Sequence, residues 1–321
     1  MVTIENYLEL GWYHLILFVA NQIAIVGVLG NLAFMVFGAI KPNIVCGLQS
    51  FVDGDQVCSL IENGTCHNFS LNYEFYSVIV QWNLICHQRS IPYIATSLQM
   101  AGVLVGVTVF GQLSDCFGRK WVAVSASVGL LISGSVSALA PTWIIFAIIR
   151  FGIGVFIGGC LSVWFVFYAE MIEKRHRTWL SSIFGMPVAH MVFGFLAFCF
   201  QDWRTLSWVT NAFSAPGVLI VIFLCPESPR WLVQKSRFKE AEKSLLKISS
   251  LNCRQIDKEE LRMVLRSEKP PSHPETYSFW HLFSTWKLSI YSIALAFAWF
   301  PTSCVAYGIL FNAGKLAGSP Y

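Results

Sequence analysis

The stretch "GQLSDCFGRK" (residues 111–120) is a short polar segment between two long apolar runs. The run before it covers residues 92–113, and the run after it covers 121–140. A helix that crosses the hydrocarbon core of a bilayer needs about 20 mostly apolar residues. The stretch is therefore predicted to be the tight turn between two antiparallel membrane helices. Gly111 and Gly118 are expected to let the two backbones bend and approach where a side chain would clash.

The same pattern of apolar runs extends over the whole chain. Of the 321 residues, 55% are hydrophobic and 12% are charged, whereas about 25% are charged in an ordinary soluble domain. In lipid each run must form a helix, because a helix closes its backbone hydrogen bonds within the segment. The predicted fold class is therefore an all-α membrane protein, with seven spans at 12–37, 92–113, 121–140, 143–168, 179–200, 205–225 and 288–311.

The basic residues predict the orientation of these spans. Seventeen lysines and arginines lie in one set of loops, at 114–120, 170–178 and 226–287. Four lie in the other set, at 38–91, 141–142, 201–204 and after 311. Basic residues accumulate in cytoplasmic loops. We therefore expect a cytoplasmic N-terminus and an external loop at 38–91.

Seven spans also suggest a seven-helix receptor, but two observations disfavour that class. Such receptors keep the N-terminus outside, whereas the basic residues here predict the reverse. The third run also lacks an Asp-Arg-Tyr motif at its end, and the seventh lacks an Asn-Pro-x-x-Tyr motif.

The loop at 38–91 has the composition of an external segment. It contains two glycosylation acceptor sites, at Asn63 and Asn68. It also contains an even number of cysteines, as expected for two disulfides in an oxidising compartment. Three pairings of these cysteines are possible, and all three remain open for Cys46, Cys58, Cys66 and Cys86.

The opening stretch resembles the G-x-L-x-D-x-x-G-R-[KR] signature of major facilitator superfamily transporters, which lies between their second and third helices. Cys116 departs from this signature, because a basic residue is usual there. Further segments resemble the organic ion transporter family within that superfamily. They are "QWNLIC" (81–86), "RFGIGVFIGG" (150–159), "AEMIEKRHR" (169–177), "PESPRWLVQKSRFKEAEKSLLKIS" (226–249) and "WFPTSCVAYGILFNAGKLAGSPY" (299–321). The resemblance runs from about residue 75 to the C-terminus.

This resemblance implies a charge network on the cytoplasmic face, which holds two six-helix halves together when the substrate site opens outward. The alternative is that the basic residues are solvated and only set the topology. The residues of the implied network and turn are Gly111, Asp115, Gly118, Arg119, Lys120, Glu170, Arg177, Glu227 and Arg230.

The resemblance also implies a central cavity between the halves, with candidate lining residues Arg150, Leu161, Phe165, His190 and Tyr307. An arginine in the membrane costs about 2.5–3.5 kcal/mol or more, so Arg150 should face protein or water. Two roles are possible for Arg150. It contacts either the substrate or a carboxylate that couples transport, or it is structural, and then its side chain snorkels to the interface or forms a hydrogen bond. His190 either couples a proton or forms a hydrogen bond between helices.

The family resemblance also implies a domain organisation. Residues 1–225 would form an N-terminal six-helix half, and 226–287 a central cytoplasmic loop. Within that loop, Phe238, Ala241, Leu245 and Ile248 form one apolar stripe of a short amphipathic helix. Residues 267–275 are expected to form an extended linker, and residues 288–321 would begin the second half.

About seven of the family's twelve helices are present, so we expect a part of a longer transporter. Two alternatives remain: a short isoform that pairs with another membrane protein and regulates it, or a nonfunctional remnant.

The predicted function is transport of small organic ions by alternating access, in a multi-pass protein of the plasma membrane. The expected partners are the organic ion, the lipid bilayer and, for a short isoform, another membrane subunit. The chain carries neither a phosphate-binding Gly-x-x-x-x-Gly-Lys loop nor a zinc spacing. It also lacks a basic stripe with interleaved aromatic residues. We therefore expect no cofactor, no metal site, no enzyme activity and no nucleic-acid partner.

Overall fold

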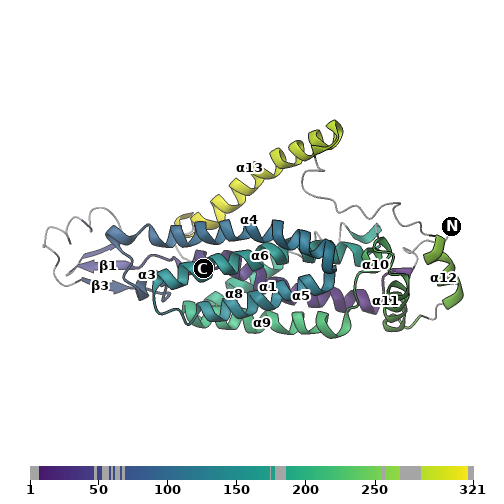
Figure 1. The fold of residues 1–321 in the computed structure, drawn as a ribbon. Coiled ribbons are helices and arrows are strands. Elements are labelled where there is room, and N and C mark those ends of the chain that lie inside the picture. Colours follow the sequence, from purple (N-terminus) through teal and green to yellow (C-terminus); the bar gives the residue numbers. More distant parts are fainter. Residues whose placement is uncertain are drawn as a thin grey trace. The chain divides into compact units, whose positions relative to one another are not determined.

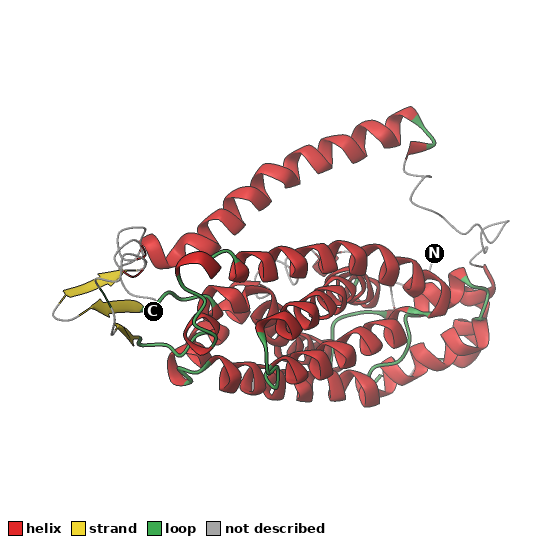
Figure 2. Ribbon diagram, turned by 60° about the vertical axis from the view of Figure 1, so that its left-hand side comes forward, coloured by secondary structure: helices red, strands yellow, loops and turns green. Residues whose placement is uncertain are grey.

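The computed structural model describes residues 7–46, 49–52, 58, 61, 66, 69–173, 175–177, 186–254, 257–267 and 283–316. Helices dominate these residues, and the strands form one small sheet (Figure 2). The chain divides into two compact units. The first comprises Met1–Leu32 and Tyr93–Pro274, and the second comprises Ala33–Pro92 and Glu275–Tyr321.

Six helices among the described residues are long and apolar enough to cross a membrane. They are α1 (Trp12–Gly38), α4 (Ile91–Phe117), α5 (Arg119–Ser137), α6 (Trp143–Met171), α9 (Trp203–Leu224) and α13 (Trp286–Leu316), shown in Figure 1. The shorter apolar helix α8 (Met186–Cys199) corresponds to the end of the run predicted at 179–200. Residues 179–185 of that run lie outside the described residues. The prediction of an all-α membrane protein is confirmed.

Glycines bring α4 and α6 of the first unit into backbone contact. A Cβ added at Gly102 or Gly106 would overlap the backbone of α6, at Gly106 the carbonyl oxygen of Val155. A Cβ at Gly154 or Gly158 would overlap the backbone of α4 in the same way. Small residues spaced four apart allow membrane helices to approach this closely. The two helices therefore pack without side chains between them at these four positions.

Three short helices lie beside the ends of the spans in the first unit, α10 (Pro229–Gln234), α11 (Phe238–Leu251) and α12 (Lys258–Ser267), as Figure 1 shows. The predicted amphipathic helix is α11, and Ala241, Leu245 and Ile248 on its apolar stripe are fully buried. The Lys247 ammonium donates to the Phe223 carbonyl oxygen over 3.1 Å. This bond fixes α11 against the last turn of α9. Apart from Ser267, which ends α12, the expected linker lies outside the described residues.

The second unit contains a sheet that the sequence pattern did not predict. Its strands are β1 (Asn43–Cys46), β2 (Gln49–Val52) and β3 (Phe69–Asn72), and both partners pair antiparallel with the central β1. The helix α3 (Val78–Gln81) and the short 3-10 helix η2 (Cys86–Gln88) follow. Each strand is only four residues long, which gives little period for sequence reasoning to detect.

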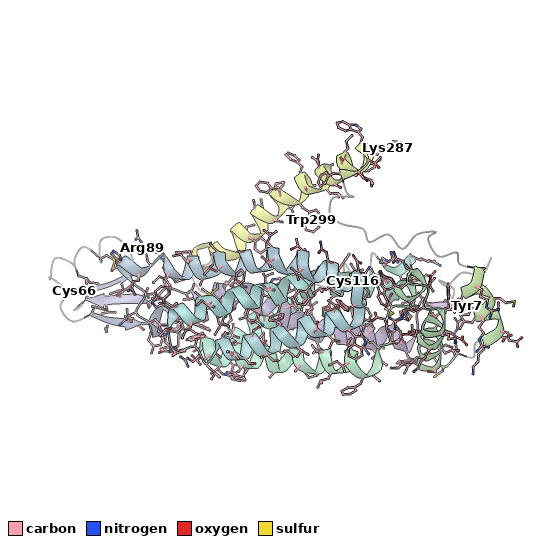
Figure 3. All side chains as sticks on the ribbon, in the orientation of Figure 1. Tyr7, Cys66, Arg89, Cys116, Lys287 and Trp299 are labelled. Carbon is pink, nitrogen blue, oxygen red and sulfur yellow. A yellow bond between two sulfur atoms is a disulfide. The ribbon has the colours of Figure 1, made fainter. Side chains whose placement is uncertain are left out.

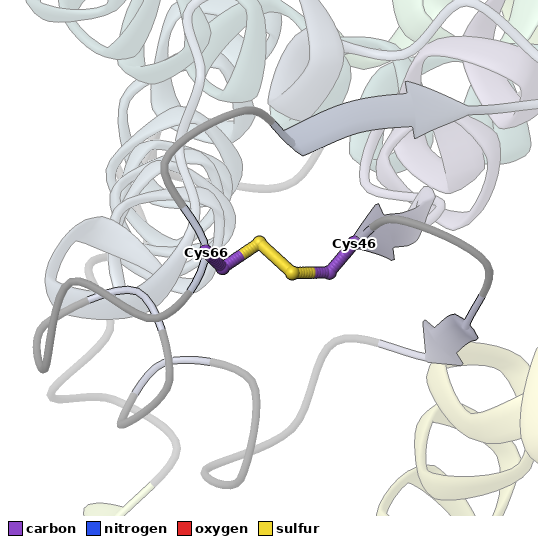
Figure 4. Close-up of a disulfide and its surroundings, with 2 residues drawn as sticks. All are labelled: Cys46 and Cys66. Carbon is purple, nitrogen blue, oxygen red and sulfur yellow. A yellow bond between two sulfur atoms is a disulfide. The ribbon is translucent and has the colours of Figure 1, made fainter.

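The four cysteines of this loop form two disulfides, as predicted. Cys46 pairs with Cys66 (Figure 4), and Cys58 pairs with Cys86. The structure thus selects one of the three possible pairings. The acceptors Asn63 and Asn68 lie outside the described residues.

Candidate functional site

The turn predicted from the opening stretch is a single residue long. The helix α4 ends at Phe117 and α5 begins at Arg119, with Gly118 between them at φ 110° and ψ 154°. A positive φ of this kind favours glycine. A Cβ at Gly118 would also lie 2.6 Å from the Glu227 carboxylate oxygen Oε2. Gly118 therefore serves both the turn and the close approach of Glu227.

Gly111 has no close neighbour in the described part of the chain, and its role in helix approach stays a prediction. A Cβ at this position would meet nothing within 4 Å among the described residues. The reason is that α4 continues six residues past Gly111, to Phe117, so that Gly111 lies inside a helix rather than in the turn.

Arg119 is the centre of a charge network at this turn. Its Nη1 atom forms an ion pair of 2.5 Å with Asp115, and its Nε atom lies 3.3 Å from Glu170 Oε1. Nη1 also donates to the Ser114 hydroxyl over 2.8 Å. The Arg119 side chain is 11% exposed and that of Glu170 19%, whereas that of Asp115 is 57% exposed. One arginine thus joins the end of α4 to the last turn of α6.

Ser228 and Trp231 connect α10 to the same network. The Ser228 hydroxyl donates to Glu170 Oε2 over 2.6 Å and accepts from the Trp231 backbone N–H over 3.2 Å, which caps α10. The Trp231 indole N–H donates to the Asp115 carbonyl oxygen over 3.2 Å. The start of α10 is therefore tied to both α4 and α6.

Glu227 and Lys120 form a second set of contacts on the other side of the turn. Glu227 Oε1 accepts from the backbone N–H groups of Lys120 and Ser228, each over 2.9 Å. The Lys120 ammonium is buried and donates to the Ile222 carbonyl oxygen over 2.8 Å. A cation at this place is favourable, because the last turn of α9 carries partial negative charge.

Two predicted arginines lie outside these contacts. The Nε and Nη2 atoms of Arg177 are buried and have no hydrogen-bond partner among the described residues. Arg230 Nη2 donates to the Ile172 carbonyl oxygen over 3.5 Å. Cys116 is a free, exposed thiol in the last turn of α4 (Figure 3).

In the interior of the first unit, Arg150 of α6 is fully buried. Its Nη1 atom donates to the Asn31 carbonyl oxygen over 3.4 Å, and its guanidinium carbon lies 4.9 Å from the centre of the Phe146 ring. Gln99 Nε2 donates to the same Asn31 oxygen over 3.0 Å. Arg150 thus forms a structural hydrogen bond to α1, and its contact with substrate or a coupling carboxylate stays a prediction.

Sequence reasoning missed the polar residues around Arg150. Asn31 Nδ2 donates to Asn211 Oδ1 over 3.0 Å, and both amides are almost completely buried, like Gln99. Each amide stands within an apolar run, so its position was a usable signal. Polar groups inside a membrane helix bundle usually face other helices and hydrogen-bond to them. Together these residues connect α1, α4, α6 and α9.

The other candidate cavity residues have different surroundings. Leu161 is partly buried against the core, whereas Phe165 is 64% exposed. His190 Nδ1 lies 2.8 Å from the Met186 carbonyl oxygen of its own helix, not of another helix. Tyr307 belongs to α13 of the second unit and is 36% exposed.

Comparisons with known proteins identify the family. Residues 68–309 match the model of the family described as "Sugar (and other) transporter". A solute carrier family 22 member 15-like protein of Xenopus laevis is 33% identical, over 85% of this chain and 55% of its own length. The organic cation transporter protein of Drosophila melanogaster is 29% identical, over 84% of this chain and 51% of its own. The chain thus spans about half the length of these curated relatives.

Among solved structures, the xylose transporter XylE from E. coli matches 77% of this chain and 58% of its own, at 20% identity and a TM-score of 0.48. The named relatives are transporters, not enzymes. The chain is a multi-pass membrane protein that belongs to the sugar (and other) transporter family, and within that family it is similar to solute carrier family 22 proteins and to an organic cation transporter.

Proposed function

We propose that this chain contributes one six-helix half, and the first helix of a second half, to an alternating-access transporter of small organic ions. Family membership supports this function, and the Arg119 network carries the mechanism. The network joins the ends of α4, α6 and α10 at one end of the first unit. Transport of this kind needs contacts at one end that hold while the other end is open and then break.

The exposure of Asp115 suggests how the network acts as a gate. Arg119 and Glu170 are largely enclosed, whereas more than half of the Asp115 side chain is open. A carboxylate has about four lone-pair sites, so Asp115 can accept bonds from a second half while it pairs with Arg119. Charge-assisted bonds contribute about 1.5–3 kcal/mol each at most, which allows the halves to part when substrate binds.

This gate is tested by Asp115→Asn, which keeps the size of the side chain but removes its charge. We expect uptake to fall by up to about fivefold at unchanged surface expression. The loss of the exposed ion pair costs the outward-open state up to about 1 kcal/mol and so shifts the equilibrium between the outward-open and inward-open states. Initial rates are measured for a radiolabelled quaternary ammonium and a radiolabelled aromatic carboxylate. The cells express the native polypeptide that contains residues 1–321, identified by immunoblot with an antibody to residues 237–252.

Glu259→Gln is the matched control, because Glu259 is exposed on α12 and lies outside the network. Normal uptake by Asp115→Asn would refute the gate but not the transport function. Uptake of both probes no higher than in mock-transfected cells would refute transport of organic ions. A native band near 36 kDa without uptake would favour the pairing of this chain with another membrane subunit.

We further propose that the N-terminus is cytoplasmic and the protein lies in the plasma membrane. The start of α1 contacts the segment after α11, which supports a position of both segments on the same side of the membrane. The Tyr13 backbone N–H donates to Asn252 Oδ1 over 2.8 Å, and Arg254 forms an ion pair of 2.5 Å with Glu9. Burial, and secondarily the charges of Glu260 and Asp257, raises the pKa of the nearby Tyr7 phenol. The basic residues of 226–287 then favour the cytoplasm.

The topology predicts that an N-glycosidase lowers the apparent mass of the native protein, because glycans are added only to lumenal segments. The shift is measured by immunoblot of cell membranes. The double variant Asn63→Gln/Asn68→Gln is the control and should run at the deglycosylated mass without treatment. An unchanged mass in a protein that keeps both acceptors would contradict an external loop at 38–91.

A further inference from the structure

A groove of about 690 Å³ lies between α11 and α12, outside the charge network. Its volume falls in the range of small-molecule sites, which is about 300–1,000 Å³. Phe238 and Leu265 supply apolar surface within it. The basic side chains that line it are Arg237, Lys239, Arg262 and Arg266. Four basic residues from two helices therefore surround one concave surface.

Acidic residues neutralise only part of this charge. Arg237 forms two hydrogen bonds to the Glu240 carboxylate, of 2.8 and 2.7 Å, and leaves its Nη1 atom for another acceptor. Arg262 uses its Nε atom for Glu242 over 2.9 Å. The lining thus carries four basic and two acidic side chains, a net charge of +2.

Lys239 and Arg266 account for the surplus. In the described part of the chain, neither has a hydrogen-bond or ion-pair partner on a side chain, although both line the groove. The first turn of α11 adds partial positive charge, because its N-cap residue Arg237 makes no side-chain capping bond. Two unpaired cations beside two arginine forks form a surface that favours an anion with several oxygens.

We propose that this groove binds a small, multiply phosphorylated anion. Phosphate suits the three arginines, because guanidinium groups bind phosphate oxygens in pairs. The groove is larger than a single phosphate requires, and its apolar surface fits the ring or carbon skeleton that carries the phosphates. The shared chemistry is a phosphorylated ring polyol, either free in solution or as the headgroup of an anionic lipid. This site goes beyond the transport function and does not depend on it.

The double variant Lys239→Gln/Arg266→Gln tests the site in the native polypeptide that contains residues 1–321, purified in detergent. The soluble probe is inositol 1,4,5-trisphosphate, measured by calorimetry. We expect the wild-type chain to bind it less tightly as salt increases. We expect the double variant to bind it about tenfold or more weakly, because it loses two charged contacts.

The matched control is Lys243→Gln/Lys258→Gln, which removes the same charge from exposed positions on the same two helices outside the groove. It should bind within about twofold of wild type. Equal loss of affinity in the two double variants would overturn the proposal, since it would reflect net charge alone. Thermal unfolding checks that both variants fold. If the double variant does not fold, Lys239→Gln alone against Lys243→Gln provides the same comparison.

The source of the phosphates is distinguished by a second measurement. The chain is placed in nanodiscs of phosphatidylcholine with or without phosphatidylinositol 4,5-bisphosphate, and its protection from proteolysis within residues 235–267 is compared. Binding of the soluble trisphosphate supports the site with a free ligand. Protection by the lipid without binding of the soluble probe supports the site with a headgroup. If the protein does not bind the soluble trisphosphate and the lipid gives no protection, the proposal is overturned.

Discussion

Gly106→Val should unfold the first unit at a much lower temperature than the wild-type chain, or prevent its folding. The physical reason is that α4 and α6 meet backbone to backbone at this position, where a Cβ alone would overlap the Val155 carbonyl oxygen. A flexible side chain can move aside, but a helix backbone cannot move without disturbing the neighbouring glycine contacts. Overpacking costs about 1–3 kcal/mol in ordinary cores, and a backbone clash of this kind should reach about 3 kcal/mol or more.

Gly152→Val is the matched control for this variant. Gly152 lies on α6 near the same contact, but a Cβ there would meet nothing within 4 Å among the described residues. Its substitution should therefore leave the unfolding temperature almost unchanged. The measurement is thermal unfolding of both purified variants in the same detergent. Equal unfolding temperatures would show that the backbone contact does not limit the packing of α4 on α6.

The second large effect is expected for Arg119→Leu. This change removes two ion pairs and the hydrogen bond to Ser114 at once, and it leaves Glu170 with the Ser228 hydroxyl. Bonds to charged groups contribute about 1.5–3 kcal/mol each, but the exposed Asp115 pair contributes less. We therefore expect the free energy of unfolding to fall by about 2–4 kcal/mol. It is measured by denaturant titration in mixed micelles.

Arg254→Leu is the control for Arg119→Leu, because it also removes an arginine from an ion pair. The side chains of Arg254 and Glu9 are 56% and 49% exposed, so water already solvates both groups. Exposed pairs contribute about 0–1 kcal/mol, and we expect a loss in that range. A loss as large as that of Arg119→Leu would mean that enclosure of the Arg119 network adds no stability.

The helices could be predicted because their signal is local. The run at 143–168 became α6 at Trp143–Met171, and Ala241, Leu245 and Ile248 of the apolar stripe became the buried side of α11. The turn after α4 was also predictable, because a glycine such as Gly118, between a polar segment and the next apolar run, is typical of a tight turn between two helices. The position of Gly111 inside α4 was not predictable, because where α4 ends depends on the contacts of Ser114 and Asp115 with Arg119 of α5 and Trp231 of α10.

By itself, the sequence determined the membrane class, most of the spans, the two disulfides as a number and the family motifs. Each of these follows from length, composition or spacing along the chain, which the bilayer and the helix period convert directly into structure. Only the tertiary structure decided which atoms meet. Arg119 reaches Glu170 across 51 residues, Arg150 reaches Asn31 across 119, and Cys46 joins Cys66 rather than Cys58 or Cys86. These choices depend on how distant helices and strands approach one another, which no local pattern contains.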